Sequence, residues 1–245
     1  MTNANTIQWK RTAAEGVAIV VSILLAFWID TYWEDRQEAQ LETLYLLELQ
    51  EDFELNKSRL EDQTAELGGI ARSMQVLQEQ SVLESPSMSV SELNKNFSQI
   101  INMTSMYLVN RAYANMTGSG DLRIIRSRPL KNALAEYYAA AQVITLVQNT
   151  HEMELVQIYE PYIIENLDYA AVGVVRVDEF PLPPPIEEAS ILNVLATRRF
   201  RNILIQKSVI TTDLINEFRT QLELTDNVLS LLKSANSENT LEDSQ

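Results

Sequence analysis

Residues 16–29 read GVAIVVSILLAFWI and contain no charged side chain. This run alone is shorter than the roughly 20 apolar residues that cross a bilayer core of about 30 Å. Its flanks extend it, because a helix from Trp9 to Trp33 would measure about 36 Å. Aromatic rings of this kind are enriched at headgroup depth on both sides of a membrane. The stretch therefore predicts a transmembrane helix over residues 12–33.

Charges on either side of the span predict its orientation. Basic residues precede it and acidic residues follow it, and the side richer in Lys and Arg stays in the cytoplasm. We therefore expect residues 1–11 to form a short cytoplasmic tail and the later residues to lie outside, in a bacterium in the periplasm. A cleavable signal peptide is the alternative, but no A-x-A-like site follows the apolar core, which favours an uncleaved signal anchor. The expected membrane-interface residues are Trp9, Lys10, Arg11, Trp28, Tyr32 and Trp33.

Glu15 is a carboxylate inside the apolar stretch, where ionisable groups often mark functional sites. It lies one helical turn after Arg11, however, and an ion pair at that spacing would satisfy both charges. We expect this pair rather than a proton or ion pathway.

Composition narrows the functional classes. The 245-residue chain has a formal net charge of −15, and the two basic and two acidic side chains before residue 34 cancel. An ectodomain this acidic repels nucleic acid, which binds through Lys and Arg contacts to phosphate. There is no cysteine, and the single histidine, His151, cannot build a His-based zinc site. We expect His151 on a helix surface, and no catalytic residue, cofactor site or metal site, so the protein is not predicted to be an enzyme.

Only six glycines and long Leu/Ile/Val/Glu/Gln-rich stretches favour an all-α fold. We expect the transmembrane helix to continue into a periplasmic, antiparallel helical bundle. The predicted ectodomain spans 34–233, with a stalk-like helix at about 34–80, helices at about 90–116, 128–160 and 190–233, and a disordered acidic tail over 234–245.

Apolar residues recur every seven positions after the span, at Leu46, Phe53, Leu60, Leu67 and Met74. This heptad pattern is typical of a coiled coil, in which the stalk would pair with a second copy. The same stripe could instead pack on other helices of its own chain. A glycine pair at 68–69 is a candidate bend, since such pairs are common kink sites.

Turn and capping signals divide the remaining chain. Ser89 with Glu92 forms a capping box, and Ser127 is placed to cap the next long helix. Pro161 should kink or end that helix. Residues 169–189 combine a short valine-rich tract with PLPPP, which favours a loop crossing the bundle or, alternatively, a docking segment for a partner.

Two stretches of the sequence are similar to sequences of other proteins. The first runs from Glu15 through ILLAF at 23–27 to Ile29, Asp30 and an aromatic and acidic ending; the second contains Tyr113, Ser119, Gly120, Leu122, Ile125, Leu130, Leu134, Tyr137 and Tyr138. They resemble an uncharacterised bacterial family of single-pass membrane proteins, known as a domain of unknown function. The resemblance implies a bacterial inner-membrane anchor with a helical outer domain and implies no chemistry.

Basic residues gather in two short windows of the acidic ectodomain. If the windows met, their side chains would form an anion or ligand site, or face anionic lipid headgroups. Alternatively they neutralise acidic helices within the chain, whose paired carboxylates such as Glu51 and Asp52 are expected on solvated faces. The candidate contacts are Arg123, Arg126, Arg128 and Lys131 in the first window and Arg198, Arg199, Arg201 and Lys207 in the second.

These features give two functional hypotheses. The first is a membrane-anchored helical interaction or scaffold protein of the bacterial cell envelope, bound to the lipid bilayer and to a protein partner or a second copy. The alternative is a four-helix-type periplasmic ligand-binding sensor domain that signals through a partner protein, with the arginine windows as its ligand contacts.

Overall fold

The computed structural model describes residues 5–101, 105–172 and 183–242. Every regular element in these residues is helical, so the all-α prediction is confirmed. The elements are α1 (Asn5–Ser81), α2 (Val90–Ile101), α3 (Arg111–Ser119), the 3-10 turn η1 (Asp121–Arg123), α4 (Arg128–Glu154), the π-helical turn η2 (Leu155–Tyr159), α5 (Glu160–Asn166), α6 (Tyr169–Val172), α7 (Ser190–Leu195) and α8 (Arg198–Glu242).

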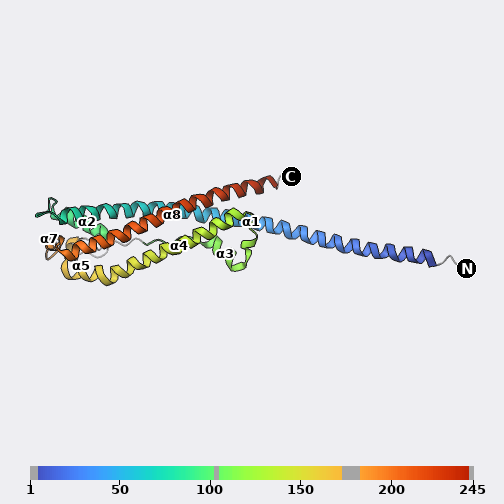
Figure 1. Cartoon of the computed structure of the whole chain (residues 1–245), viewed down its shortest axis with the longest axis horizontal. Helices are drawn as coiled ribbons and strands as arrows, with labels where there is room; N and C mark the ends of the chain where they lie inside the picture. Colours follow the sequence, from blue (N-terminus) through green and yellow to red (C-terminus); the bar gives the residue numbers. More distant parts are fainter. Residues whose placement is uncertain (1–4, 102–104, 173–182, 243–245) are drawn as a thin grey trace.

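The first part of α1 extends away from the other helices as a single rod (Figure 1). It is the one helix in the described residues that is long and apolar enough to cross a membrane, with a mean hydropathy of 2.1 over its best window and none of that window buried. The expected ion pair is present, since Arg11 Nε lies 3.2 Å from Glu15 Oε1. The glycine pair at 68–69 does not interrupt α1.

Helix α8 runs back along α1. Lys57 pairs with Asp226 near the middle of the two helices, and Gln78 donates to Ser208 near the far end of α1. Residue numbers therefore fall along α8 as they rise along α1. Helix α4 packs on the same α8, and the three long helices form the body of the bundle (Figure 1).

The heptad stripe of α1 is buried inside this chain. Leu46, Phe53, Leu60, Leu67 and Met74 are all at most 1% exposed. They divide between two cores, a proximal one nearer the apolar rod and a distal one at the opposite end of the bundle. The stripe thus packs on helices of its own chain, which is the alternative to pairing with a second copy.

Capping signals in the sequence correctly located two helix starts. The Ser89 backbone N–H donates to Glu92 Oε2 at 2.9 Å, and Glu92 N–H donates back to Ser89 Oγ. Ser127 Oγ accepts from the Leu130 N–H, which begins α4.

Two predicted helices are wrong because each is divided. The predicted helix at about 90–116 ends at Ile101 and resumes only at Arg111, since the chain at 105–110 is non-helical and is held by side chains of other helices. The predicted helix at 190–233 is broken after α7, where Thr197 Oγ1 accepts from the Phe200 N–H and caps α8.

The structure also differs from the prediction in the C-terminal tail and at the start of the valine-rich tract. Helix α8 continues to Glu242, because Ala235 still packs into the proximal core and Asn236 still reaches α1. The start of the strand-like tract, Tyr169–Val172, is a helical turn. Residues 173–182 lie outside the described residues, as do 243–245.

Candidate functional site

The two basic windows lie at opposite ends of the bundle. Arg123 Nη1 is 2.6 Å from Glu38 Oε1 on α1, whereas Lys207 is next to Ser208, which bonds Gln78. Glu38 and Gln78 are separated by about 60 Å of helix. The windows therefore do not converge, and no single anion site is built from both.

The first window contacts acidic residues of α1 near the end of the apolar rod. Besides the Arg123 pair, the Arg126 backbone N–H donates to Glu42 Oε1 at 2.5 Å, and its guanidinium Nε lies 3.4 Å from Oε2. Arg128 is exposed and Lys131 half-buried in the first turn of α4. Intramolecular pairing, the alternative to an anion site, is thus present for two of the four basic residues.

The expected membrane-interface rings are all on the surface of the rod. Trp9 is 82% exposed, and Trp28, Tyr32 and Trp33 are also exposed. Trp28 stacks on Tyr32 with ring centroids 6.1 Å apart. The side chain of Lys10 lies outside the described residues, whereas Arg11 is paired with Glu15.

Lys207 of the second window forms a buried pair with His151 of α4, which was expected on a helix surface. His151 and Lys207 are each only 3% exposed, and Lys207 Nζ lies 2.9 Å from His151 Nε2. Burial, and then the charge of Lys207, lowers the pKa of His151 to about 4. Burial also lowers the pKa of Lys207 to about 8, although Glu154 acts in the opposite direction. Because the imidazole is neutral at neutral pH, its Nε2 can accept from the ammonium.

A polar rim connects this pair to the surface. Lys207 Nζ lies 5.3 Å from the ring centre of Tyr159, whose hydroxyl donates to Glu154 Oε2 at 2.7 Å. Gln206 donates to the other oxygen of Glu154. Tyr159 ends the π-helical turn η2, which precedes Pro161. Proline lacks an N–H donor, and wider turns of this kind are frequent where a helical hydrogen bond is lost.

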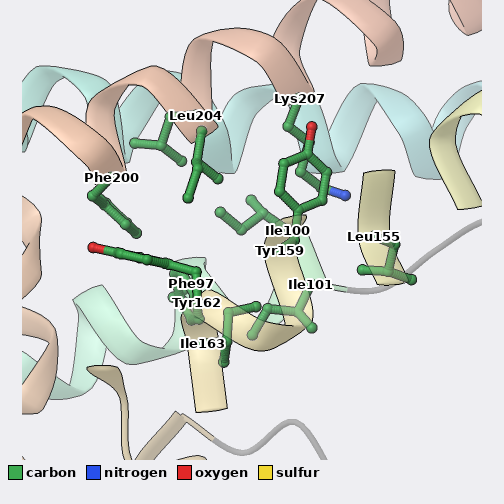
Figure 2. Close-up of a pocket in the computed structure, with 11 residues that line it drawn as sticks. Phe97, Ile100, Ile101, Leu155, Tyr159, Tyr162, Ile163, Phe200, Leu204 and Lys207 are labelled. Carbon is green, nitrogen blue, oxygen red and sulfur yellow. The ribbon is translucent and has the colours of Figure 1, made fainter. Parts of the chain in front are cut away.

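Beyond Tyr159 lies a small apolar cavity in the distal core. Figure 2 shows Lys207 at its edge, with the rings of Phe200 and Tyr162 next to each other farther along it. The cavity measures about 20 Å³, which holds about one water molecule. An amine with a pKa near neutrality is a potential nucleophile, but this space admits no substrate. The His151–Lys207 pair is therefore part of the buried interior of the bundle. The lining residues are Phe97, Ile100, Ile101, Leu155, Tyr159, Tyr162, Ile163, Phe200, Ile203, Leu204 and Lys207.

Two buried amides hold the non-helical segment 105–110 inside the bundle. Asn56 donates to the Val109 carbonyl at 2.8 Å and accepts from the Val109 N–H at 2.7 Å. Gln148 of α4 makes the equivalent pair with Met106, with both distances 3.2 Å. Each side-chain amide thus donates to and accepts from one residue of the segment, as a neighbouring peptide group would. These bonds pair backbone N–H and C=O groups that make no helical hydrogen bond.

The segment 105–110 forms one wall of a cleft of about 400 Å³, with α3 and α4 as the others. This volume is in the range of small-molecule sites. Tyr113 stacks on Tyr138 in its wall, with ring centroids 4.0 Å apart. Its lining residues are Met106, Tyr107, Leu108, Asn110, Tyr113, Ala114, Thr117, Tyr138, Ala141, Gln142, Ile144 and Thr145.

Asp52 corrects the expectation that adjacent carboxylates lie on solvated faces. It is 1% exposed, and its Oδ1 accepts from Arg111 Nε and Nη2 at 2.9 and 2.7 Å. Its Oδ2 accepts from the Ala112 N–H at the start of α3. The negative charge of Asp52 interacts favourably with the positive end of the helix dipole at the N-terminus of α3. Asp52 therefore holds α3 against α1.

The distal end of the bundle exposes apolar and arginine side chains together. Ile186 is fully exposed, and its backbone N–H donates to Asp168 after α5. We call this surface the distal tip; it comprises Val82, Leu83, Ile164, Ile186, Leu192, Arg198, Arg199 and Arg201, all exposed. Figure 1 shows α5 and α7, which supply Ile164 and Leu192, at the end opposite the N-terminus.

No group of three or more His, Asp or Glu side chains in the described ranges is arranged to hold a metal ion. The chain matches no protein-family model, no curated protein and no solved structure.

Proposed function

We propose that this protein is a membrane-anchored helical interaction or scaffold module of the bacterial cell envelope, without catalytic activity, which presents its distal tip to a protein partner or a second copy. The observation that supports it is the composition of that tip. Interfaces are enriched in arginine and apolar anchors, and grouped exposed apolar side chains on a soluble surface mark interaction sites.

The geometry of α1 suits a scaffold. The helix continues without a break from the apolar rod to Ser81, so the distance from Trp33 to its end is about 70 Å. The distal tip is thereby held far from the bilayer, where it can reach a partner that is not itself at the membrane surface. The heptad stripe is buried within the chain, so it is not the contact surface that we propose.

The location is part of the same proposal. An anchor in the inner membrane, with a cytoplasmic N-terminus and a periplasmic bundle, is supported by Lys10 and Arg11 before the span. The chain has no cysteine, so single-cysteine variants give an unambiguous test. An impermeant maleimide applied to cells with a permeable outer membrane should label Ser234→Cys and spare Asn3→Cys. Labelling of Asn3→Cys alone would reverse the topology.

Photo-crosslinking tests the tip directly. A photoreactive amino acid replaces Ile164 or Ile186 in the full-length protein, and Leu146 on the outer face of α4 serves as the control, since Ile164 and Leu146 are equally exposed at 66%. We expect adducts of one discrete mass from the two tip positions and none from Leu146. Equal adducts from all three positions, or none from any, would contradict the proposal.

A periplasmic sensor domain is the second candidate, and the cleft beside 105–110 favours it. The arginine windows do not supply its ligand contacts, because they lie at opposite ends of the bundle. A ligand in the cleft would instead contact the segment that Asn56 and Gln148 hold between α1 and α4. Its occupancy would be transmitted through that segment to the helices and to a partner.

A further inference from the structure

The cleft formed by residues 105–110, α3 and α4 is lined without a single charged side chain. Charged residues make up 22% of the chain, and the protein has a net charge of −15. Twelve lining residues without one charge therefore distinguish this cleft from the rest of the ectodomain. A ligand that depends on ionic contacts would find no counter-charge in its walls.

Aromatic faces are the first recognition element. Tyr107 is 81% exposed and stands at the cleft, while Tyr113 and Tyr138 form a stacked pair in its wall. Burial raises the pKa of Tyr138, so its hydroxyl keeps its proton at neutral pH. That hydroxyl is buried and has no hydrogen-bond partner in the described part of the chain.

Neutral hydrogen-bonding groups are the second element. The side-chain amides of Asn110 and Gln142 line the cleft, and no hydrogen bond to another described residue occupies either. Each offers two N–H donors and an acceptor oxygen. Thr117 and Thr145 already donate their protons to helix carbonyls, which leaves their oxygen lone pairs as acceptors.

Side-chain hydrogen bonds fix the backbone that forms one wall of the cleft. Its wall at 105–110 is fixed at one end by the two bonds of Gln148 to Met106 and at the other by those of Asn56 to Val109. Sites whose groups are held in place before binding lose less conformational entropy on binding. The cleft therefore does not have to form around its ligand.

We propose that this cleft binds a neutral oligosaccharide. Pyranose rings combine apolar C–H faces, which pack on aromatic rings, with uncharged hydroxyls that donate to and accept from amides and hydroxyls. A volume of about 400 Å³ suits one or two such rings. The inference does not depend on the distal tip or on a protein partner; for the sensor candidate, it identifies the class of ligand.

Other ligand classes fit the walls less well. An apolar ligand would leave the amides of Asn110 and Gln142 without partners. An anion would find no basic side chain in the lining, and an organic cation would find no carboxylate there. A polyhydroxylated neutral ring satisfies both the aromatic faces and the amides.

The test uses the full-length protein in lipid nanodiscs, because sugar-headgroup detergents would compete. Saturation-transfer-difference NMR is recorded with neutral tetrasaccharides of glucose, galactose, mannose and N-acetylglucosamine, followed by calorimetry of those that bind. We expect binding of at least one, with the strongest saturation on ring C–H protons. Tyr107→Ala and Gln142→Ala should each weaken it roughly fivefold to tenfold.

Asn149→Ala is the matched control, since Asn149 carries an exposed side-chain amide on the same helix but outside the cleft. It should bind like the wild type. Because Tyr107 and Gln142 are exposed, their variants should keep the helical circular dichroism of the wild type, so lost binding would not reflect unfolding. The proposal is overturned if none of the four sugars binds, or if Gln142→Ala and Asn149→Ala bind equally.

Discussion

Lowering the pH from 6.5 to 4 should weaken the folded bundle through His151. Burial beside Lys207 gives the imidazole a pKa of about 4, compared with 6.5 for an unperturbed histidine. The folded state therefore resists protonation, whereas the unfolded chain takes up a proton once the pH falls below 6.5. Because the unfolded state then binds more protons, the free energy of unfolding decreases as the pH falls. The decrease begins near 6.5 and is complete near 4.

The magnitude follows from the two pKa values. The difference between 6.5 and about 4 corresponds to about 3 kcal/mol in the free energy of unfolding. This is a substantial part of the roughly 5–15 kcal/mol typical of a folded domain. Carboxylates with lowered pKa values, such as Asp121 and Asp168, also lose stabilisation in acid. The contribution of His151 must therefore be isolated by a variant.

His151→Gln provides that variant. Glutamine keeps an oxygen that can accept from Lys207 Nζ but does not titrate in this range. Urea unfolding of both proteins in nanodiscs is followed by far-ultraviolet circular dichroism, because all three tryptophans lie outside the bundle, at or before residue 33. The wild type should lose about 3 kcal/mol more than His151→Gln between pH 6.5 and 4. Equal losses in the two proteins would refute the account of the buried pair.

Three further substitutions test the packing. Asn56→Leu places an apolar side chain at a fully buried position of α1, yet it should destabilise the bundle by about 2 kcal/mol in urea unfolding, since it leaves two backbone groups of Val109 unpaired. Leu67→Ala should lower the free energy of unfolding by about 3 kcal/mol without changing the mass of any complex, because Leu67 is buried within the chain; a loss of dimer with unchanged stability would contradict this. Lys207→Met should raise the free energy of unfolding at pH 7 by roughly 1–3 kcal/mol, because it removes a buried charge. Above pH 10.5 the substitution should change the free energy of unfolding little. The lowered pKa of Lys207 makes the wild type gain stability between pH 8 and 10.5, as the folded protein releases this proton before the unfolded chain does.

The long helices and their starts could be predicted because local sequence determines them. The apolar rod follows from composition, and the capping residues Ser89 and Ser127 act within one turn of their helices. The heptad stripe predicted the buried face of α1, but not which helices cover it. That choice depends on how the later helices return, which no local pattern encodes.

The break at 105–110 could not be predicted, since residues far along the chain cause it. Asn56 is a polar residue on the buried face of α1, seven residues after Leu49, and its role becomes visible only when Val109 lies beside it. The cleft depends on the same segment, so no local pattern indicates it. Among the cleft residues, the sequence patterns singled out only Tyr113 and Tyr138.

The sequence contains a pattern that predicts the burial of His151, although its polar character suggested a surface position. His151 continues a seven-residue series on α4 that begins with Tyr137 and Ile144, both buried. Lys207 likewise stands midway between buried Phe200 and Leu214 on α8. A polar residue at the position of an apolar repeat predicts a buried polar contact, whereas counting Lys207 with the neighbouring arginines predicted an exposed cation.

The mass of the complex extracted from native membranes tests the central claim most directly. The full-length protein is released in polymer nanodiscs, and the mass of its protein content is measured for the wild type, for the tip variant Ile164→Asp with Ile186→Asp, and for the control Leu146→Asp. The account predicts an assembly larger than one chain in the wild type and the control, and a single chain in the tip variant. A wild-type protein that emerges alone, or an assembly that survives both tip substitutions, would contradict it.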